Sequence, residues 1–279
     1  MVAAVVRAGA LRRNRGSHNR MRKMGRRICG GLALLATAAS AEDMPQAVGR
    51  ISYSDVLQPG AAICSGVLVA PGLVLTAGHC VRGAVGDPAV LRFDAGWTDG
   101  TPARRRGRAV ILATEALSAG LAGLPQDVAL VVLDAPFAPD EATPLPIAAA
   151  PADDFTLHAF ARTTPDQPRP AVPCDLRATI PAVRAPDSGE PDLPGSDLGG
   201  PDFPGLGLLG LGCPVVSGNS GAPLLQADGT GWQIAAIMVA SGRGPVQAWA
   251  ARIPEILLTR ILQRVAGSNG DVAQPAPTP

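Results

Sequence analysis

Histidine is scarce in this chain, with three in 279 residues, and one of them, His18, lies in a basic N-terminal stretch. Any imidazole that acts as a catalytic base in the remainder must therefore be His79 or His158. Lysine is nearly absent too, since Lys23 is the one lysine among 24 basic residues. No apolar run reaches the roughly 20 residues that a membrane-spanning helix requires, so no such helix is expected.

Acidic residues are missing from the first 41 positions, which carry eight Arg and one Lys. An apolar run from Ile28 to Ala39 follows, and the stretch ends in Ala39-Ser40-Ala41. This pattern is typical of a secretory signal peptide with a long basic n-region, spanning residues 1–41 and cleaved after Ala41. Arg26-Arg27 leaves a twin-arginine export route open.

Loss of that segment changes the charge balance, because 24 basic residues minus 9 leaves 15 against 23 acidic residues, a net charge near −8. Such a chain has no basic footprint for a nucleic-acid partner. The run Arg104-Arg105-Arg106 with Arg108 is the exception, and we expect it on a solvated loop between strands. Neither nucleic acid nor, after cleavage, a membrane is predicted as a partner.

Five cysteines become four once Cys29 leaves with the signal peptide. An even count in an exported chain predicts disulfides, and four cysteines allow three pairings. Cys64 and Cys80 flank an apolar segment with Pro71-Gly72 at its centre, which indicates a hairpin that brings its ends together. We therefore predict Cys64–Cys80, which leaves Cys174–Cys213, in a secreted or periplasmic bacterial protein.

Short apolar and β-branched runs separated by Gly and Pro predict an all-β protein. They lie at 62–69, 73–77, 110–113, 128–133, 155–161 and 174–183. Five prolines between Ala135 and Asp154 oppose strand pairing and suggest an interdomain connection. We accordingly place a first unit at 42–140, a linker at 141–155 and a second unit at 156–267.

Two segments of the second half have their own composition. Residues 186–205 hold five acids among Pro and Gly and predict an inserted surface loop, with calcium binding as an alternative. Apolar residues at helical spacing from Pro254 to Val265 predict a C-terminal α-helix. Residues 268–279 are polar and rich in Pro, which predicts a disordered tail.

Three short motifs hold candidate catalytic residues. His79 follows the apolar run Leu75-Thr76-Ala77-Gly78, Asp127 directly precedes the buried-strand pattern of 128–133, and Ser220 lies in Gly218-Asn219-Ser220-Gly221-Ala222-Pro223. A serine hydroxyl needs a base to take its proton, and the base needs an orienting carboxylate. Each motif alone has a structural explanation: a histidine beside a disulfide, a strand-capping aspartate and an ordinary hairpin turn.

Together the motifs resemble the chymotrypsin/trypsin-like serine protease family, in which the order His, Asp, Ser is typical. The resemblance covers roughly 48–265 and implies two six-stranded antiparallel β-barrels with the triad between them. It also implies that His79 is the general base, that Asp127 orients it, that Ser220 forms the acyl-enzyme and that the amides of Gly218 and Ser220 form the oxyanion hole. His158 is expected to be structural.

The expected function is a serine endopeptidase acting on proteins or peptides as a monomer, with no cofactor and no metal. A non-catalytic binding protein on the same fold and a serine esterase are the alternatives. Asn219 stands where zymogen-activated members have an aspartate that pairs with a new N-terminus. The sequence Gly218-Asn219-Ser220-Gly221 is more similar to that of the bacterial glutamyl-endopeptidase-like branch, which matures without that step. Activation by cleavage at Arg50-Ile51 is therefore disfavoured.

The substrate pocket has no obvious charge. The position of the trypsin pocket floor aligns with Pro214, followed by Val215, and the wall with Val239-Ala240-Ser241. No carboxylate is present to select Arg or Lys, and no cation or histidine to select an acidic residue. We expect small or apolar residues at the cleavage site.

Overall fold

The computed structural model describes residues 44–98, 101–114, 120–180 and 207–253. All of them belong to the larger of two compact units, residues 39–279. The predicted signal peptide, the inserted loop 186–205, the C-terminal helix and the tail lie outside the described residues. None of the helices in the described ranges is long and apolar enough to cross a membrane.

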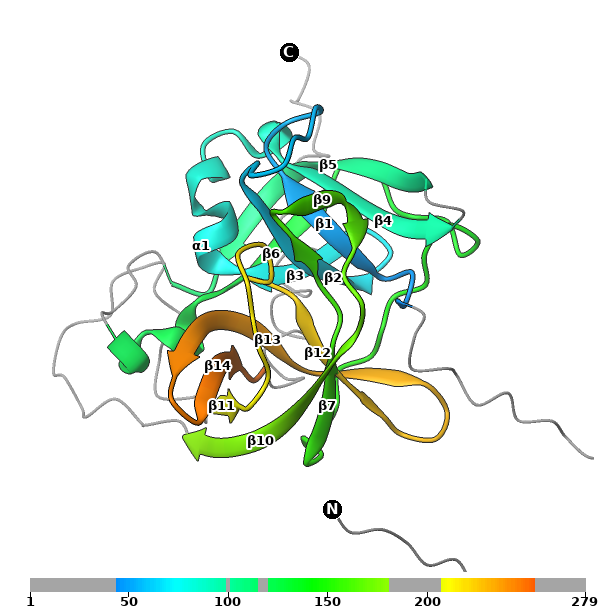
Figure 1. Cartoon of the computed structure of the whole chain (residues 1–279). Coiled ribbons are helices and arrows are strands. Elements are labelled where there is room, and N and C mark those ends of the chain that lie inside the picture. Colours follow the sequence, from blue (N-terminus) through cyan, green and yellow to red (C-terminus); the bar gives the residue numbers. More distant parts are fainter. Residues whose placement is uncertain (1–43, 99–100, 115–119, 181–206, 254–279) are drawn as a thin grey trace, which may run out of the picture. The chain divides into compact units, whose positions relative to one another are not determined.

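The first six long strands close into an antiparallel barrel in the order β1-β2-β3-β6-β5-β4 (Figure 1). Their bounds are β1 Val48–Ser52, β2 Ile63–Ala70, β3 Leu73–Ala77, β4 Arg92–Thr98, β5 Thr101–Leu112 and β6 Val128–Leu133. β3 and β6 are buried along their whole length, as expected for strands whose sequences are nearly continuous apolar runs. The predicted spans 73–77 and 128–133 are confirmed to the residue.

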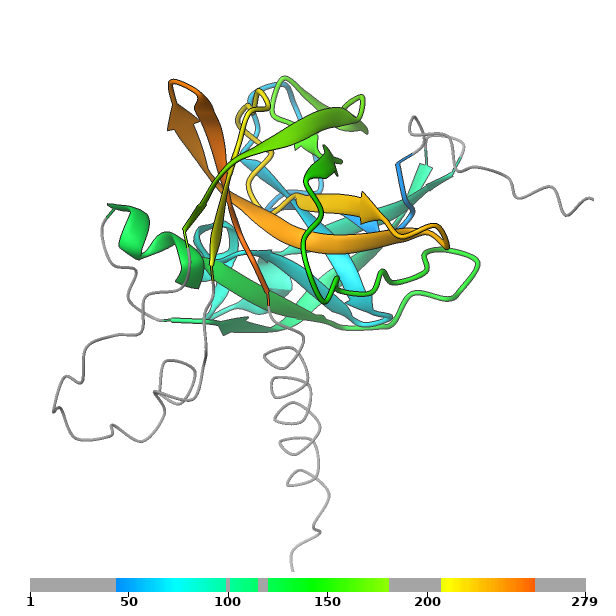
Figure 2. The same ribbon diagram turned by 90° about the horizontal axis from the view of Figure 1, so that it is seen from below.

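The second barrel has the order β10-β11-β14-β13-β12-β7 and is again closed and antiparallel. Its strands are β7 Asp154–Leu157, β10 Val172–Ile180, β11 Leu208–Leu211, β12 Pro223–Ala227, β13 Trp232–Arg243 and β14 Val246–Ala251. β13 is a long curved strand in both views (Figures 1 and 2). It pairs with β12 up to Ile237 and with β14 from Ile237 onward. The two-barrel, all-β fold is thus confirmed.

Short elements connect these strands. A two-stranded sheet, β8 Phe160–Ala161 and β9 Thr164–Pro168, follows β7. The helices are α1 Gly78–Val81 and the 3-10 turns η1 Arg82–Ala84, η2 Pro88–Val90, η3 Gly120–Ala122 and η4 Leu124–Gln126. In the proline-rich segment 135–153 the described pairing is a single bridge from Ile147 to Ile234.

Two disulfides join Cys64 to Cys80 and Cys174 to Cys213, as predicted. The first joins β2 to α1, and the second joins β10 to the segment after β11. Each therefore links strands or turns that also carry the proposed site: Cys80 is next to His79, and Cys213 lies seven residues before Ser220.

The prediction that Arg104, Arg105, Arg106 and Arg108 lie on a solvated loop is wrong, because all four lie within β5. Consecutive arginines can lie in one strand here because carboxylates of neighbouring segments neutralise their charges. Arg104 binds Asp94 of β4, and Arg105 binds Glu141. Local composition misleads here because the neutralising groups are brought close only by the fold.

Candidate active site

Asp127 binds His79 at two points. His79 Nδ1 lies 2.5 Å from Asp127 Oδ2, and the backbone N–H of His79 donates to Asp127 Oδ1 over 2.7 Å. The Asp127 side chain is 4% exposed, whereas that of His79 is 40% exposed. A buried carboxylate needs such partners. The contact fixes the ring so that Nε2, the far nitrogen, stays available.

The local chain explains why these two residues meet. β3 and β6 are paired from Leu73 and Val132 to Ala77 and Val128, so α1 begins where β6 starts. The Gly78 N–H donates to the Asp127 carbonyl over 3.0 Å. A side chain at Gly78 would lie 3.0 Å from Asp127 Oδ1, and glycine leaves that space for the carboxylate.

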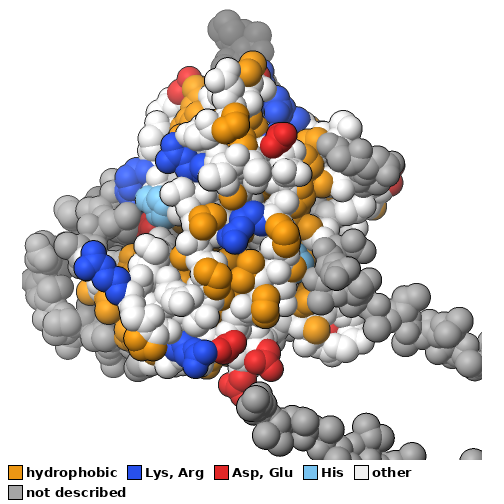
Figure 3. Space-filling model, viewed as in Figure 1, with side chains coloured by type: hydrophobic (Ala, Val, Ile, Leu, Met, Phe, Trp, Pro, Cys, Tyr) orange, Lys and Arg blue, Asp and Glu red, His pale blue; other side chains and the backbone are white. Residues whose placement is uncertain are grey.

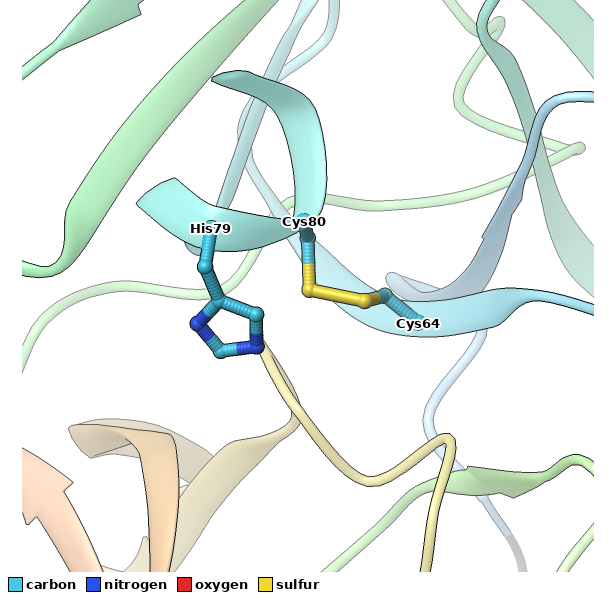
Figure 4. A group of neighbouring side chains, drawn as sticks. All are labelled: Cys64, His79 and Cys80. Atoms are coloured by element: carbon cyan, nitrogen blue, oxygen red, sulfur yellow. A yellow bond between two sulfur atoms is a disulfide. The ribbon is translucent and has the colours of Figure 1, made fainter. Parts of the chain in front are cut away.

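The Cys64–Cys80 disulfide lies directly beside His79 (Figure 4). The ligand-type atoms of Cys64, His79 and Cys80 are within 4.8 Å of one another. Because the two sulfur atoms are bonded to each other, this cluster offers no pair of thiolates to a metal ion. It instead anchors α1 to β2.

Ser220 lies in a turn just before β12, and this turn is fastened to both barrels. Its carbonyl accepts the Ser65 N–H of β2 over 2.8 Å, and the Gly221 N–H donates to Met238 of β13 over 2.7 Å. Gly221 has φ +78°, and a Cβ there would lie 2.1 Å from Thr76 Oγ1. Only glycine allows the backbone to come this close to β3. The Ser220 turn therefore lies against Thr76 and Ala77 at the end of β3, and His79 follows Ala77 by two residues.

From Val216 to Ala222, three backbone N–H groups have no acceptor in the described part of the chain, those of Ser217, Gly218 and Ser220. The last two are the predicted oxyanion donors. The Ser217 carbonyl, which shares a peptide plane with the Gly218 N–H, accepts from Arg162 N–H over 2.9 Å. In a trans peptide the two groups point in opposite directions, so the Gly218 N–H points away from Arg162. The Ser220 hydroxyl likewise makes no hydrogen bond to any described residue.

Asn219 is 1% exposed, and both ends of its side-chain amide are hydrogen-bonded. Its Nδ2 donates to the Phe160 carbonyl over 2.7 Å, and its Oδ1 accepts from Val216 N–H and from Arg169 Nη1 over 2.9 and 2.6 Å. Burial lowers the pKa of Arg169. Sequence reasoning missed Arg169, because 50 residues separate it from Asn219 and no local pattern marks the pair.

A new N-terminus at Ile51 does not fit this arrangement. Arg50 and Ile51 are 4% and 2% exposed and pair with both β2 and β4. Cleavage between them would cut a buried strand, and Asn219 already has a cationic partner. These contacts support the expectation that activation does not use this bond.

His158 lies elsewhere, after β7. It is 1% exposed, its Nε2 has no partner among the described residues, and its ring packs edge-on against Trp232 at 5.6 Å. Desolvation lowers its pKa to about 4. The structure thus places His158 in a core environment without a carboxylate, consistent with the structural role expected for it.

The segments predicted to form the substrate pocket differ in exposure. Pro214 is exposed, while Val215 is half-buried against the core of the second barrel. Val239 is buried and Ser241 is exposed along β13. From Val239 to Arg243 this strand pairs only with β14 among the described strands, so its other edge is open for an extended peptide.

Comparison with known proteins assigns this chain to a family. The trypsin-like peptidase domain model matches residues 64–231, whereas no curated protein sequence matches. Among solved structures, the scabies mite inactivated protease paralogue S-D1 is similar with a TM-score of 0.53 and 12% identity, covering 80% of this chain and 93% of its own. The active form of the M. tuberculosis Rv3671c protease gives 0.45 and 19%, covering 84% of each chain. Because the family model spans more than half of the sequence, this chain belongs to the trypsin/chymotrypsin-like serine protease family.

Proposed function

We propose that this protein is an exported serine endopeptidase that cleaves peptide bonds through His79, Asp127 and Ser220. The observation that carries the proposal is the double contact of a buried Asp127 carboxylate with the ring and backbone of His79. A similar fold alone would not suffice, because the similar scabies mite protein is an inactivated protease paralogue.

In the proposed reaction, His79 is the general base. Nδ1–H donates to Asp127, which leaves Nε2 unprotonated and able to accept the Ser220 proton. Ser220 Oγ then forms a bond to the scissile carbonyl carbon, and the carbonyl electron pair moves onto oxygen. Asp127 stabilises the imidazolium that results and stays ionised itself.

Collapse of this intermediate breaks the C–N bond, and the leaving amine takes the proton from His79 Nε2. The product is an ester between the substrate acyl group and Ser220. Water then repeats the sequence in place of the serine: it gives its proton to His79, attacks the ester carbon and releases the acid, and Ser220 regains its proton.

The oxyanion in both steps is assigned to the N–H groups of Gly218 and Ser220, which have no other described acceptor. Preorganised donors of this kind contribute about 10²–10³ in kcat each. The Gly218 φ of +104° is a left-handed value that glycine adopts readily. The hydroxyl of Ser220 aligns with His79 when substrate binds, as catalytic hydrogen bonds often do.

Export is supported by the two disulfides, which persist in an oxidising compartment, and by the signal-peptide pattern of residues 1–41. We assign the mature protein to the periplasm or the extracellular space, acting as a monomer on protein or peptide substrates. The uncharged pocket segments at Pro214-Val215 and Val239-Ala240-Ser241 favour small or apolar residues before the scissile bond.

The experiment is digestion of an unfolded protein and of a peptide library by the purified wild type, by Ser220→Ala and by the control Ser54→Ala. The control alters an exposed serine whose hydroxyl bonds to Val56. We expect cleavage by the wild type and the control, and none by Ser220→Ala. Hydrolysis of simple esters without peptide cleavage would favour the esterase. No hydrolysis of either, with retained peptide binding, would favour the non-catalytic binding protein.

A further inference from the structure

Arg162 is an exposed arginine next to the Ser220 turn with no carboxylate partner among the described residues. We propose that its guanidinium binds an acidic side chain of the substrate on the leaving-group side of the scissile bond. This inference rests on the proposed endopeptidase function and adds a specificity-determining residue to it.

The backbone of Arg162 is fixed between the two barrels. Its N–H donates to the Ser217 carbonyl over 2.9 Å, and its own carbonyl accepts the Gly60 N–H over 2.7 Å. A Cβ built on Gly218 would lie 2.9 Å from the Arg162 nitrogen. Arg162 is therefore directly behind the peptide that holds one of the two proposed oxyanion donors.

The side chain is preorganised as well. Nε donates to the Ala61 carbonyl over 3.0 Å, and Nη2 donates to the Gly60 carbonyl over 2.6 Å. These bonds hold the guanidinium in one orientation, which reduces the entropy lost when a ligand binds. Of five N–H donors, two are used, and those of Nη1 have no described acceptor.

Other described arginines near carboxylates are neutralised. Arg104 binds Asp94 and Asp55, and Arg177 binds Asp175. Arg162 binds only carbonyl oxygens, which carry no net charge. Its positive charge is thus available to an incoming carboxylate, the group that a guanidinium recognises best. On the face shown in Figure 3, acidic side chains gather mainly toward the upper and lower ends, and the middle shows mostly apolar and basic side chains.

The position of Arg162 selects the leaving-group half of the substrate. On one side, the Ser220 turn is hydrogen-bonded to Met238 of β13. The part of β13 that follows, from Val239 to Arg243, has a free edge that can pair with the acyl half of a peptide. On the other side the turn is tied to Ser65, beside the disulfide and His79. His79 must protonate the leaving amine, so that amine lies on this second side, where Gly60 and Ala61 hold Arg162.

The test uses peptides with one cleavage site and a single Glu or Gln at the first, second or third residue after the scissile bond. We expect kcat/KM to be about three- to tenfold higher with Glu at one of these positions, the range of an exposed ion pair up to a well-oriented one. Side chains of an extended peptide alternate, so the adjacent positions should show little preference.

Three variants separate the outcomes. Arg162→Gln should lose the Glu/Gln preference, and the control Arg108→Gln on β5 should keep it. Arg162→Glu should prefer a third peptide with Lys at the same position over the Gln peptide. Binding of the same peptides to Ser220→Ala gives the preference in Kd without turnover. A wild type that cleaves the Gln peptide with no Glu preference at any position overturns the role of Arg162 alone. Absence of all cleavage contradicts the proposed function, and equal Kd values for Glu and Gln peptides would still refute the Arg162 site.

Discussion

The two barrels bury different polar groups, and this difference explains the different roles of their histidines. Among the described residues, the buried carboxylates, Asp94 and Asp127, both belong to the first barrel. The second barrel buries the neutral side chains of His158 and Asn219. A histidine beside a buried carboxylate becomes an oriented base, whereas one packed in a core without a carboxylate stays neutral and unpartnered. The surroundings of each ring, more than its exposure, decide what it can do.

Replacing each histidine in turn tests this comparison with the largest expected effect. His79→Ala should lower kcat by about 10⁶, since loss of the base costs about as much as loss of the whole triad. His158→Phe should change kcat by no more than about threefold, because His158 has no contact with the catalytic groups. The measurement is steady-state kinetics on one peptide. A comparable loss in both variants would break the comparison.

Removing the charge of the buried carboxylate is the next test. Asp127→Asn should lower kcat by about 10⁴, because the amide favours the wrong imidazole tautomer. Asp134→Asn is a matched control, since Asp134 lies at the other end of β6, is exposed and accepts the Arg106 N–H. Kinetics from pH 6 to 9 should show the loss at every pH. An intact rate for Asp127→Asn would show that orientation comes from elsewhere.

A smaller effect is expected in the second barrel, where the Ser220 turn is held by the buried side-chain amide of Asn219, which accepts a hydrogen bond from Arg169. Arg169→Met should lower kcat by about tenfold with little change in KM, since one of the two hydrogen bonds to Asn219 Oδ1 is lost and the turn loosens. Arg169→Lys should recover part of the rate. Equal loss in KM and kcat for both variants, with a lower melting temperature, would indicate a merely structural role.

The last test concerns acid stability and the histidine that is buried in the second barrel, His158. Its pKa is about 4 in the folded protein and near 6.5 when unfolded. The unfolded chain therefore takes up the proton first, and the free energy of unfolding falls as the pH drops from about 6.5 to 4, by up to about 3 kcal/mol. Urea unfolding of Ser220→Ala with and without His158→Phe, at pH 7 and pH 4.5, measures it. The prediction fails if both lose the same stability.

Much of this could be predicted from the sequence, because the informative features are local. β3 and β6 are continuous apolar runs, the three motifs lie at strand ends, and Cys64 and Cys80 flank a hairpin. The missed features are contacts between distant segments. Arg50 of β1 binds both Asp94 and the Pro165 carbonyl, 115 residues away, and Ser65 Oγ bonds to Gly218 and Phe160. No periodicity marks such partners, which is also why a loop was expected at the arginine-rich part of β5, residues 104–108.

Reaction of the intact protein with a fluorophosphonate, followed by peptide mapping, tests the proposed triad most directly. We expect a single adduct, on Ser220, which forms rapidly in the wild type and in His158→Phe and is lost in His79→Ala and Asp127→Asn at the same exposure time. An unlabelled wild type, or an adduct on Ser220 that forms as fast without His79, would contradict it.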